Sequence, residues 1–309
     1  MLDDLINNIS LLRASFNIKR IEKDLQKKST EIAKVHFNHK TSLIKFALIA
    51  PIALYYSLPR KERNKAKFNE YIDMMAFGLY AGDLEDAMND NELDFFGDNS
   101  NLNNDAKNRK SEKVRSHFLN KSEDLAKQNG LYLMYNRAKN QSREYQKTEA
   151  KLAKQLKNGD TSFVNQLFKE NPNLENMTYD RIAVLYTFGV KAAFRMFLNN
   201  TSVEEYYKNI KTWSRYLPIA MQEGADDAND LKEDLARNVP TPPILRGIKH
   251  KLDLGNNIIW PLANDDDVIF YGKEDTKEQV NKYFKKIRHL DLPEVLHKIT
   301  IKAREEINI

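Results

Sequence analysis

The sequence predicts an all-α protein, arranged either as one multi-helix bundle or as two packed helical domains. Apolar residues recur at intervals of three and four along most of the chain, which is the period of an amphipathic helix. Only 10 of the 309 residues are glycine and 9 are proline, so few breaks interrupt these patterns. Strand-like composition is limited to residues 257–271, where we expect at most a small hairpin.

Residues 1–97 are predicted to form an N-terminal helical domain. A long helix is expected from Leu2 to about Phe37, followed by an apolar helix over 41–58 and a third helix that begins after Pro59. The first helix is amphipathic, with a coiled-coil-like seam that shifts in phase near its middle. The predicted seam consists of Leu5, Ile9, Leu12, Phe16, Ile21, Leu25, Ile32 and Val35.

The segment 41–58 reads TSLIKFALIAPIALYYSL and is apolar on nearly all sides. It contains Lys45 and Pro51, and it barely reaches the length that a bilayer-spanning helix needs. We therefore interpret this segment as a helix buried in the centre of the protein. A membrane contact is the alternative interpretation.

Residues 98–111 are predicted to form a polar linker or loop, because they are rich in Asn, Asp and Ser and nearly free of apolar residues. The remainder, 112–309, is predicted to form a C-terminal helical domain. Its expected helices span residues 112–128, 131–156, 163–170, 178–198, 202–216, 277–287 and 293–307.

The composition excludes several classes of chemistry. The chain has no cysteine, so disulfides, thiolate metal sites and cysteine nucleophiles are unavailable. Polar residues interrupt the first apolar positions, so we expect no signal peptide and a cytoplasmic location. The histidines show no zinc-ligand spacing, and no glycine-rich phosphate loop or nucleophile elbow is present.

The net charge of +5 is unevenly distributed. Residues 107–157 hold 14 basic and 5 acidic residues, whereas residues 83–98 hold 7 acidic and no basic ones. Two sets of carboxylates have spacings of three and four residues, which would place each set on one face of a helix. The first set is Asp83, Asp86, Asp90 and Asp94, and the second is Glu223, Asp227, Asp230 and Asp234.

Within these sets, Asp86-x-x-x-Asp90 and Asp226-Asp227-x-x-Asp230 resemble the paired aspartate motifs of the all-α prenyl-transferring and squalene or phytoene synthases. In that family, two facing helices hold magnesium ions against a diphosphate. The resemblance implies Asp86, Asp90, Asp227 and Asp230 as metal ligands and Mg²⁺ as cofactor. It covers about ten residues and does not extend to the family's flanking aromatic and arginine residues. Outside this enzyme alternative, we expect no cofactor.

A basic stripe lies on one face of the helix expected at 131–156, and consists of Lys139, Arg143, Lys147, Lys151 and Lys154. Such a row could follow a phosphate backbone, which makes a nucleic-acid-binding protein one alternative. Glu144 and Glu149 interrupt the charge, and Tyr145 is the one aromatic residue nearby for base stacking. A solvated outer face is the simpler interpretation.

Aromatic residues are frequent in the predicted helices, and most of them are expected in the core. Tyr206, Tyr207, Trp213 and Tyr216 are the candidates for an interface, because Tyr and Trp are favoured anchors of protein contacts. No complete catalytic set is present, so the leading hypothesis is a non-catalytic helical protein of an inhibitory, toxin-neutralising or secretion-associated type. It would bind a protein partner through its charged patches.

Overall fold

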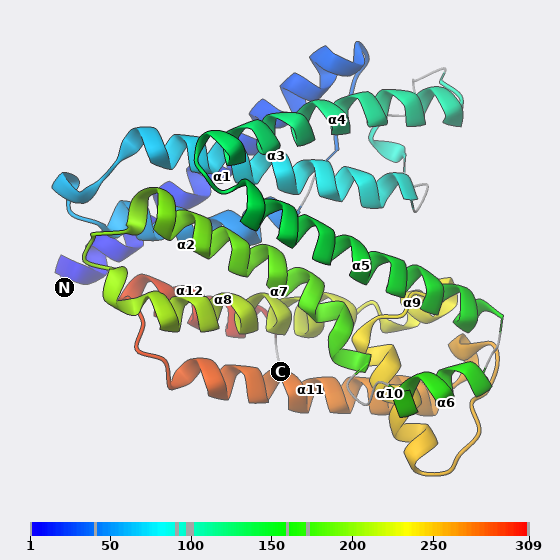
Figure 1. Cartoon of the computed structure of the whole chain (residues 1–309). Coiled ribbons are helices and arrows are strands. Elements are labelled where there is room, and N and C mark those ends of the chain that lie inside the picture. Colours follow the sequence, from blue (N-terminus) through cyan, green and yellow to red (C-terminus); the bar gives the residue numbers. More distant parts are fainter. Residues whose placement is uncertain are drawn as a thin grey trace. The chain divides into compact units, whose positions relative to one another are not determined.

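The computed structural model describes residues 2–39, 42–89, 93–96, 102–158, 161–170 and 174–307. These residues form helices joined by short loops, and none of them lies in a strand (Figure 1). The all-α prediction is thus confirmed. The segment considered for a hairpin instead contains a cis Trp260–Pro261 bond, the short helix η6 (Leu262–Asn264) and the start of α11 (Asp266–Arg288).

The chain divides into two compact units. Unit 1 comprises Met1–Tyr135, Gly189–Tyr207 and Pro293–Leu296, and unit 2 comprises Asn136–Phe188, Lys208–Leu292 and His297–Ile309. Each unit is therefore built from segments that are distant in the sequence. The linker predicted at 98–111 falls within the first segment of unit 1, and the predicted domain boundary stays a prediction.

Unit 1 begins with the helices α1 (Leu2–Ala33) and α2 (Ser42–Ser57), which pack against each other. The second packed pair is α3 (Lys65–Asn89) and α4 (Asn104–Gln128). Short helices complete this part of the chain: η1 (Arg60–Glu62), η2 (Asp94–Phe96), η3 (Phe194–Leu198) and η4 (Glu204–Tyr206).

The apolar helix α2 is a core element of unit 1. Ile44, Leu48 and Ile52 are fully buried, and Tyr55 stacks on Phe68 of α3 with 3.8 Å between ring centroids. Burial of these side chains supplies the hydrophobic stabilisation that the apolar composition of the segment predicts. Among the described residues, no helix combines the length and the hydropathy that crossing a membrane requires.

The buried face of α1 differs from the predicted seam. Its buried residues include Leu11, Ala14, Ile18, Leu25 and Ser29, which follow one another at steps of three, four or seven residues. This row runs along the helix without the phase shift of the predicted seam, because it accepts small and hydroxyl side chains at packed positions. As a result, three residues of the predicted seam are exposed: Ile9, Leu12 and Phe16.

The first turns of α4 occupy residues 104–111, where the sequence had suggested a loop. Asn103 caps this helix, since its side-chain oxygen accepts a hydrogen bond of 2.9 Å from the backbone N–H of Ala106. Lys110 Nζ donates to the carbonyl oxygen of Ala33, and this hydrogen bond joins the first turns of α4 to the end of α1. A cap and a tertiary contact therefore offset the weak apolar pattern. Residues 97–101 lie outside the described residues.

Unit 2 contains most of α5 (Tyr132–Lys157), together with α6 (Thr161–Glu170) and part of α7 (Leu174–Ala193). Its second half is formed by α8 (Tyr207–Met221), η5 (Gln222–Asp227), α9 (Leu231–Arg237), α10 (Pro242–Asp253), α11 and α12 (Glu294–Ile307), of which residues 297–307 belong to this unit.

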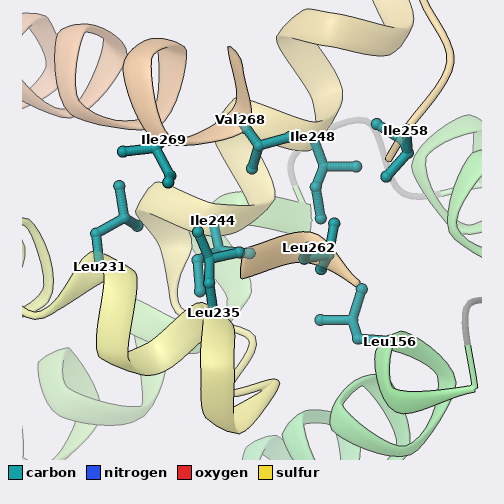
Figure 2. Close-up of a cluster of buried hydrophobic side chains, with 9 residues drawn as sticks. All are labelled: Leu156, Leu231, Leu235, Ile244, Ile248, Ile258, Leu262, Val268 and Ile269. Carbon is teal, nitrogen blue, oxygen red and sulfur yellow. The ribbon is translucent and has the colours of Figure 1, made fainter. Parts of the chain in front are cut away.

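A cluster of buried aliphatic side chains lies among α5, α9, α10, η6 and α11 (Figure 2). Figure 2 shows that these side chains, which come from the five elements and, for Ile258, from the loop before η6, gather around the side of α10 that carries Ile244 and Ile248. The members of the cluster are Leu156, Leu231, Leu235, Ile244, Ile248, Ile258, Leu262, Val268 and Ile269.

Two glycines allow α10 and α11 to cross with their backbones in contact. A Cβ atom placed on Gly247 would lie 2.1 Å from the carbonyl oxygen of Val268, and one on Gly272 would lie 2.6 Å from the carbonyl oxygen of Pro243. Only glycine fits such a separation. The crossing brings the charged residues of α10 within reach of α11.

Candidate functional site

The candidate functional site of unit 2 is a set of buried charged residues that surrounds α10. Arg246 is at its centre and is 7% exposed. Its Nη1 atom donates to Oε2 of Glu223, at 2.8 Å, and to Oγ1 of Thr276, at 3.0 Å. Because Glu223 is fully buried, this ion pair lies in a low-dielectric environment in which breaking it is costly.

Glu223 is placed in this position by η5, a π-helical segment. The backbone N–H of Ala228 donates to the carbonyl oxygen of Glu223, which is the five-residue bond of a π-helix. In the same segment, Gln222 Nε2 donates to Oδ1 of Asp227 at 3.0 Å, and Asp227 is also buried.

Burial, together with the neighbouring charge of Glu223, raises the pKa of Tyr283 on α11 to about 12.

A second buried ion pair joins the end of α10 to the start of α11. Lys251 Nζ lies 2.6 Å from Oδ1 of Asp265 and 3.1 Å from Oδ2 of Asp267. Asp265 also accepts hydrogen bonds from the backbone N–H groups of Ile259, at 2.7 Å, and Val268, at 3.3 Å. Asp265 is thereby both the N-cap of α11 and the anchor of the preceding loop.

A third contact between the two helices involves His250. Its Nδ1 atom lies 2.8 Å from Oδ2 of Asp275, and its ring stacks on that of Tyr271 with 4.1 Å between centroids. Arg246, His250 and Lys251 of α10 thus each contact an acidic residue elsewhere in unit 2. The arrangement fixes helices against one another, and the two cations, Arg246 and Lys251, each face at least one carboxylate.

The aspartates assigned to the enzyme alternative lie in different parts of the structure. Asp86 lies on α3 in unit 1 and is half-buried, whereas Asp227 and Asp230 lie in unit 2. Asp227 is buried in η5, and Asp230 is exposed at the N-terminus of α9. Asp90 lies outside the described residues. Within the part of the chain that the structure describes, no group of three acidic or histidine side chains is arranged to hold a metal ion.

The basic stripe lies on α5, within unit 2. Lys147, Lys151 and Lys154 are exposed, whereas Lys139 and Arg143 are half-buried. Lys147 Nζ lies 2.7 Å from Oε1 of Glu144, and both side chains are more than 70% exposed. An ion pair in such a position contributes little to stability, so a partner could replace it at small cost.

The four aromatic interface candidates have different environments. Trp213 is buried in unit 2, where its indole N–H donates to Oγ1 of Thr300 at 2.8 Å. Tyr216 is half-buried and stacks on Tyr283. Tyr206 and Tyr207 are half-buried in unit 1. The indole of Trp213 therefore serves the packing of unit 2, and an interface role for the tyrosines stays a prediction.

Three residues of the buried set were not singled out from the sequence: Arg246, Lys251 and Asp265. For Lys251 a signal does exist, because it lies three residues after Ile248 and seven after Ile244, on the face that carries the apolar cluster. A lysine at such a core position predicts a buried acidic partner. Nothing comparable marks Arg246, whose partner Glu223 is 23 residues away.

Unit 1 contains a separate buried histidine contact. His39 Nε2 lies 2.7 Å from Oδ2 of Asp83, and the imidazole ring packs edge-on against Tyr80 and Phe95. The contact joins the segment after α1 to α3 and η2. Asp83, the first member of the acidic set, is thus engaged within unit 1.

Comparisons with known proteins add no family to this description. No protein-family model matches the sequence, and no curated protein shows significant similarity to it.

Proposed function

We propose that this chain is a non-catalytic helical interaction protein, which binds a protein partner through charged patches on its surface. The observation that carries the proposal is the exposed, mixed-charge face of α5, where Lys147, Lys151 and Lys154 are exposed and Glu144 is paired with Lys147. Rows of exposed charges accelerate association and select partners of complementary charge.

The buried ion pairs of unit 2 support the same proposal. Arg246 and Lys251 are engaged with Glu223 and Asp265, so these groups fix the helices in place. A rigid helical scaffold holds surface residues in a constant arrangement, which lowers the entropy lost on binding. The charged groups inside the unit thus support the fold, and the lysines at 147, 151 and 154 on α5 are exposed where a partner can reach them.

The composition of the α5 face favours a protein over a nucleic acid. Glu144 is 71% exposed within the basic row, where it would repel a phosphate backbone. Tyr145 accepts a hydrogen bond from Gln141 Nε2 and is half-buried, so its ring is only partly available for base stacking. A partner with both acidic and basic side chains would match this face better than a polyanion would.

Charge reversal tests the proposal. The variant Lys147→Glu, Lys151→Glu, Lys154→Glu is compared with the control Lys273→Glu, Lys277→Glu, which reverses exposed lysines of α11. Affinity isolation from native lysate followed by quantitative mass spectrometry should show a protein retained by the wild type and the control and lost by the α5 variant. Equal retention by all three would refute the role of α5. Displacement by duplex DNA or RNA, with a steep salt dependence, would favour nucleic-acid binding instead.

A further inference from the structure

An apolar row is exposed on the surface of α1. Ile9, Leu12 and Phe16 are 38, 59 and 71% exposed, respectively. Their spacing of three and four residues places them next to one another on one face of the helix. Single exposed apolar residues are ordinary on protein surfaces, whereas a contiguous row of large apolar side chains is a feature that many contact sites share.

Basic residues continue the same face toward the C-terminal end of α1. Lys19 and Lys23 follow Leu12 and Phe16 with spacings that keep all four on one face. Most of the charge around it is also basic: Arg13, Arg20, Lys27 and Lys28 are exposed, whereas Glu22 is half-buried and Asp24 is the one exposed acidic side chain between residues 9 and 28. The face is therefore apolar at one end and positively charged at the other.

The opposite side of α1 is packed against the rest of unit 1, so this face points toward solvent. Leu11, Ala14 and Ile18 are buried, and α1 packs against α2. On one flank, the Arg13 guanidinium lies 5.5 Å from the centroid of the Tyr56 ring, and Asn17 Nδ2 donates to the hydroxyl of Tyr56 at 3.1 Å. The helix is thus fixed in rotation, with its apolar and basic row directed to solvent.

We propose that this face of α1 docks on an anionic membrane surface. Ile9, Leu12 and Phe16 would enter the boundary between lipid headgroups and acyl chains, while Lys19 and Lys23 contact the negative headgroups. Long lysine side chains can keep the ammonium group at headgroup level above a more deeply placed phenyl ring. This contact goes beyond the proposed protein binding and uses a different surface.

Size and shape favour a membrane over a protein as the occupant. The exposed fractions of the three apolar side chains correspond to roughly 300 Å² of surface, whereas a stable protein interface buries about 800 Å² on each partner. The row lies on one convex helix, so a protein would have to supply a matching groove. A lipid interface accommodates a convex surface, and its negative headgroups complement the basic end.

Vesicle co-sedimentation of the full chain tests the inference. Vesicles of phosphatidylcholine alone are compared with vesicles that also contain phosphatidylserine, at low and high salt. The wild type should sediment with the anionic vesicles, and less so at high salt. Lys19→Gln with Lys23→Gln should weaken the partition by about 30-fold, and Phe16→Ser by on the order of tenfold. Leu12→Ser probes the same row independently.

Matched controls separate the α1 face from general hydrophobicity and charge. Leu133→Ser removes a leucine of α5 that is 84% exposed, and Lys273→Gln with Lys277→Gln removes two charges from α11. Both controls should sediment as the wild type does, and circular dichroism checks that each variant is folded. Equal sedimentation with both kinds of vesicle, or equal losses in the controls and the α1 variants, would overturn the inference. The inference would also be overturned if the wild type stayed in the supernatant with both kinds of vesicle while the Phe16→Ser variant no longer captured a protein that the wild type binds.

Discussion

Gly247→Ala would test whether the close crossing of α10 and α11 holds the charged set of unit 2 together. The added methyl group would lie 2.1 Å from the carbonyl oxygen of Val268, and 2.9 Å from its carbonyl carbon. An ordinary contact needs at least 3.4 Å, so one backbone must move by more than 1 Å. Such a shift would stretch the bonds from Arg246 and Lys251, which start on either side of Gly247.

The size of the effect follows from two opposing contributions. Overpacking against an immobile backbone costs about 3 kcal/mol, at the upper end of the usual range. Replacing glycine by alanine within a helix gains about 1 kcal/mol. We therefore expect Gly247→Ala to lower the free energy of unfolding by about 2 kcal/mol.

Urea unfolding followed by tryptophan fluorescence is a suitable assay, because both tryptophans, Trp213 and Trp260, belong to unit 2. The fluorescence midpoint of Gly247→Ala should fall. In the matched control Gly82→Ala, on α3, the new methyl group meets no atom within 4 Å, so this variant should be neutral or gain up to about 1 kcal/mol by circular dichroism. A Gly247→Ala variant as stable as the wild type would refute the idea that the close crossing of α10 and α11 holds the charged set of unit 2 together.

Three other predictions concern stability. Lys251→Met leaves the carboxylate of Asp265 buried without its cation and should cost about 3–5 kcal/mol, seen as a lower urea midpoint; a loss below about 1 kcal/mol would contradict the buried pair. Burial raises the pKa of Tyr283 from 10.0 to about 12, so this phenol stabilises the fold below pH 10. That contribution is lost as the pH rises toward 12. The Tyr283→Phe variant should therefore unfold less readily in alkali than the wild type. Hydrogen bonds from Arg115 lower the pKa of Glu112, so this carboxylate stabilises the fold above its ordinary pKa of 4.5. The contribution disappears as the pH falls. The Glu112→Gln variant should therefore show a flatter acid side in its profile of thermal stability against pH.

Hydrophobic period and composition were sufficient to predict the fold class and the main helices. The apolar segment 41–58 became α2 with almost the predicted bounds, because a run of apolar residues of this length has to be buried. The period could not identify which face of α1 packs. Leu12 and Phe16 are larger and more apolar than Ala14, but the neighbouring helix lies on the side of Ala14, and only tertiary contacts determine that.

The second carboxylate set shows why the candidate site was harder to predict. Spacings of four, three and four place Glu223, Asp227, Asp230 and Asp234 on one face only if the helix keeps 3.6 residues per turn. In the structure the chain changes to π-helical bonding at Gln222–Asp227 and then turns before α9 begins at Leu231. Glu223 and Asp227 are consequently buried, while Asp230 is exposed.

The burial of Glu223 in the π-helical segment depends on Arg246. An isolated carboxylate in a core would be strongly destabilising, so the sequence can tolerate Glu223 there only because α10 delivers a guanidinium to within 2.8 Å. That delivery in turn requires Gly247, since a side chain at this position would separate α10 from α11 and from Thr276. A glycine, an arginine and a glutamate that share no local motif thus form one physical unit. Pairwise long-range contacts of this kind carry no periodic signal, which is why spacing rules recover helices and miss the charges that join them.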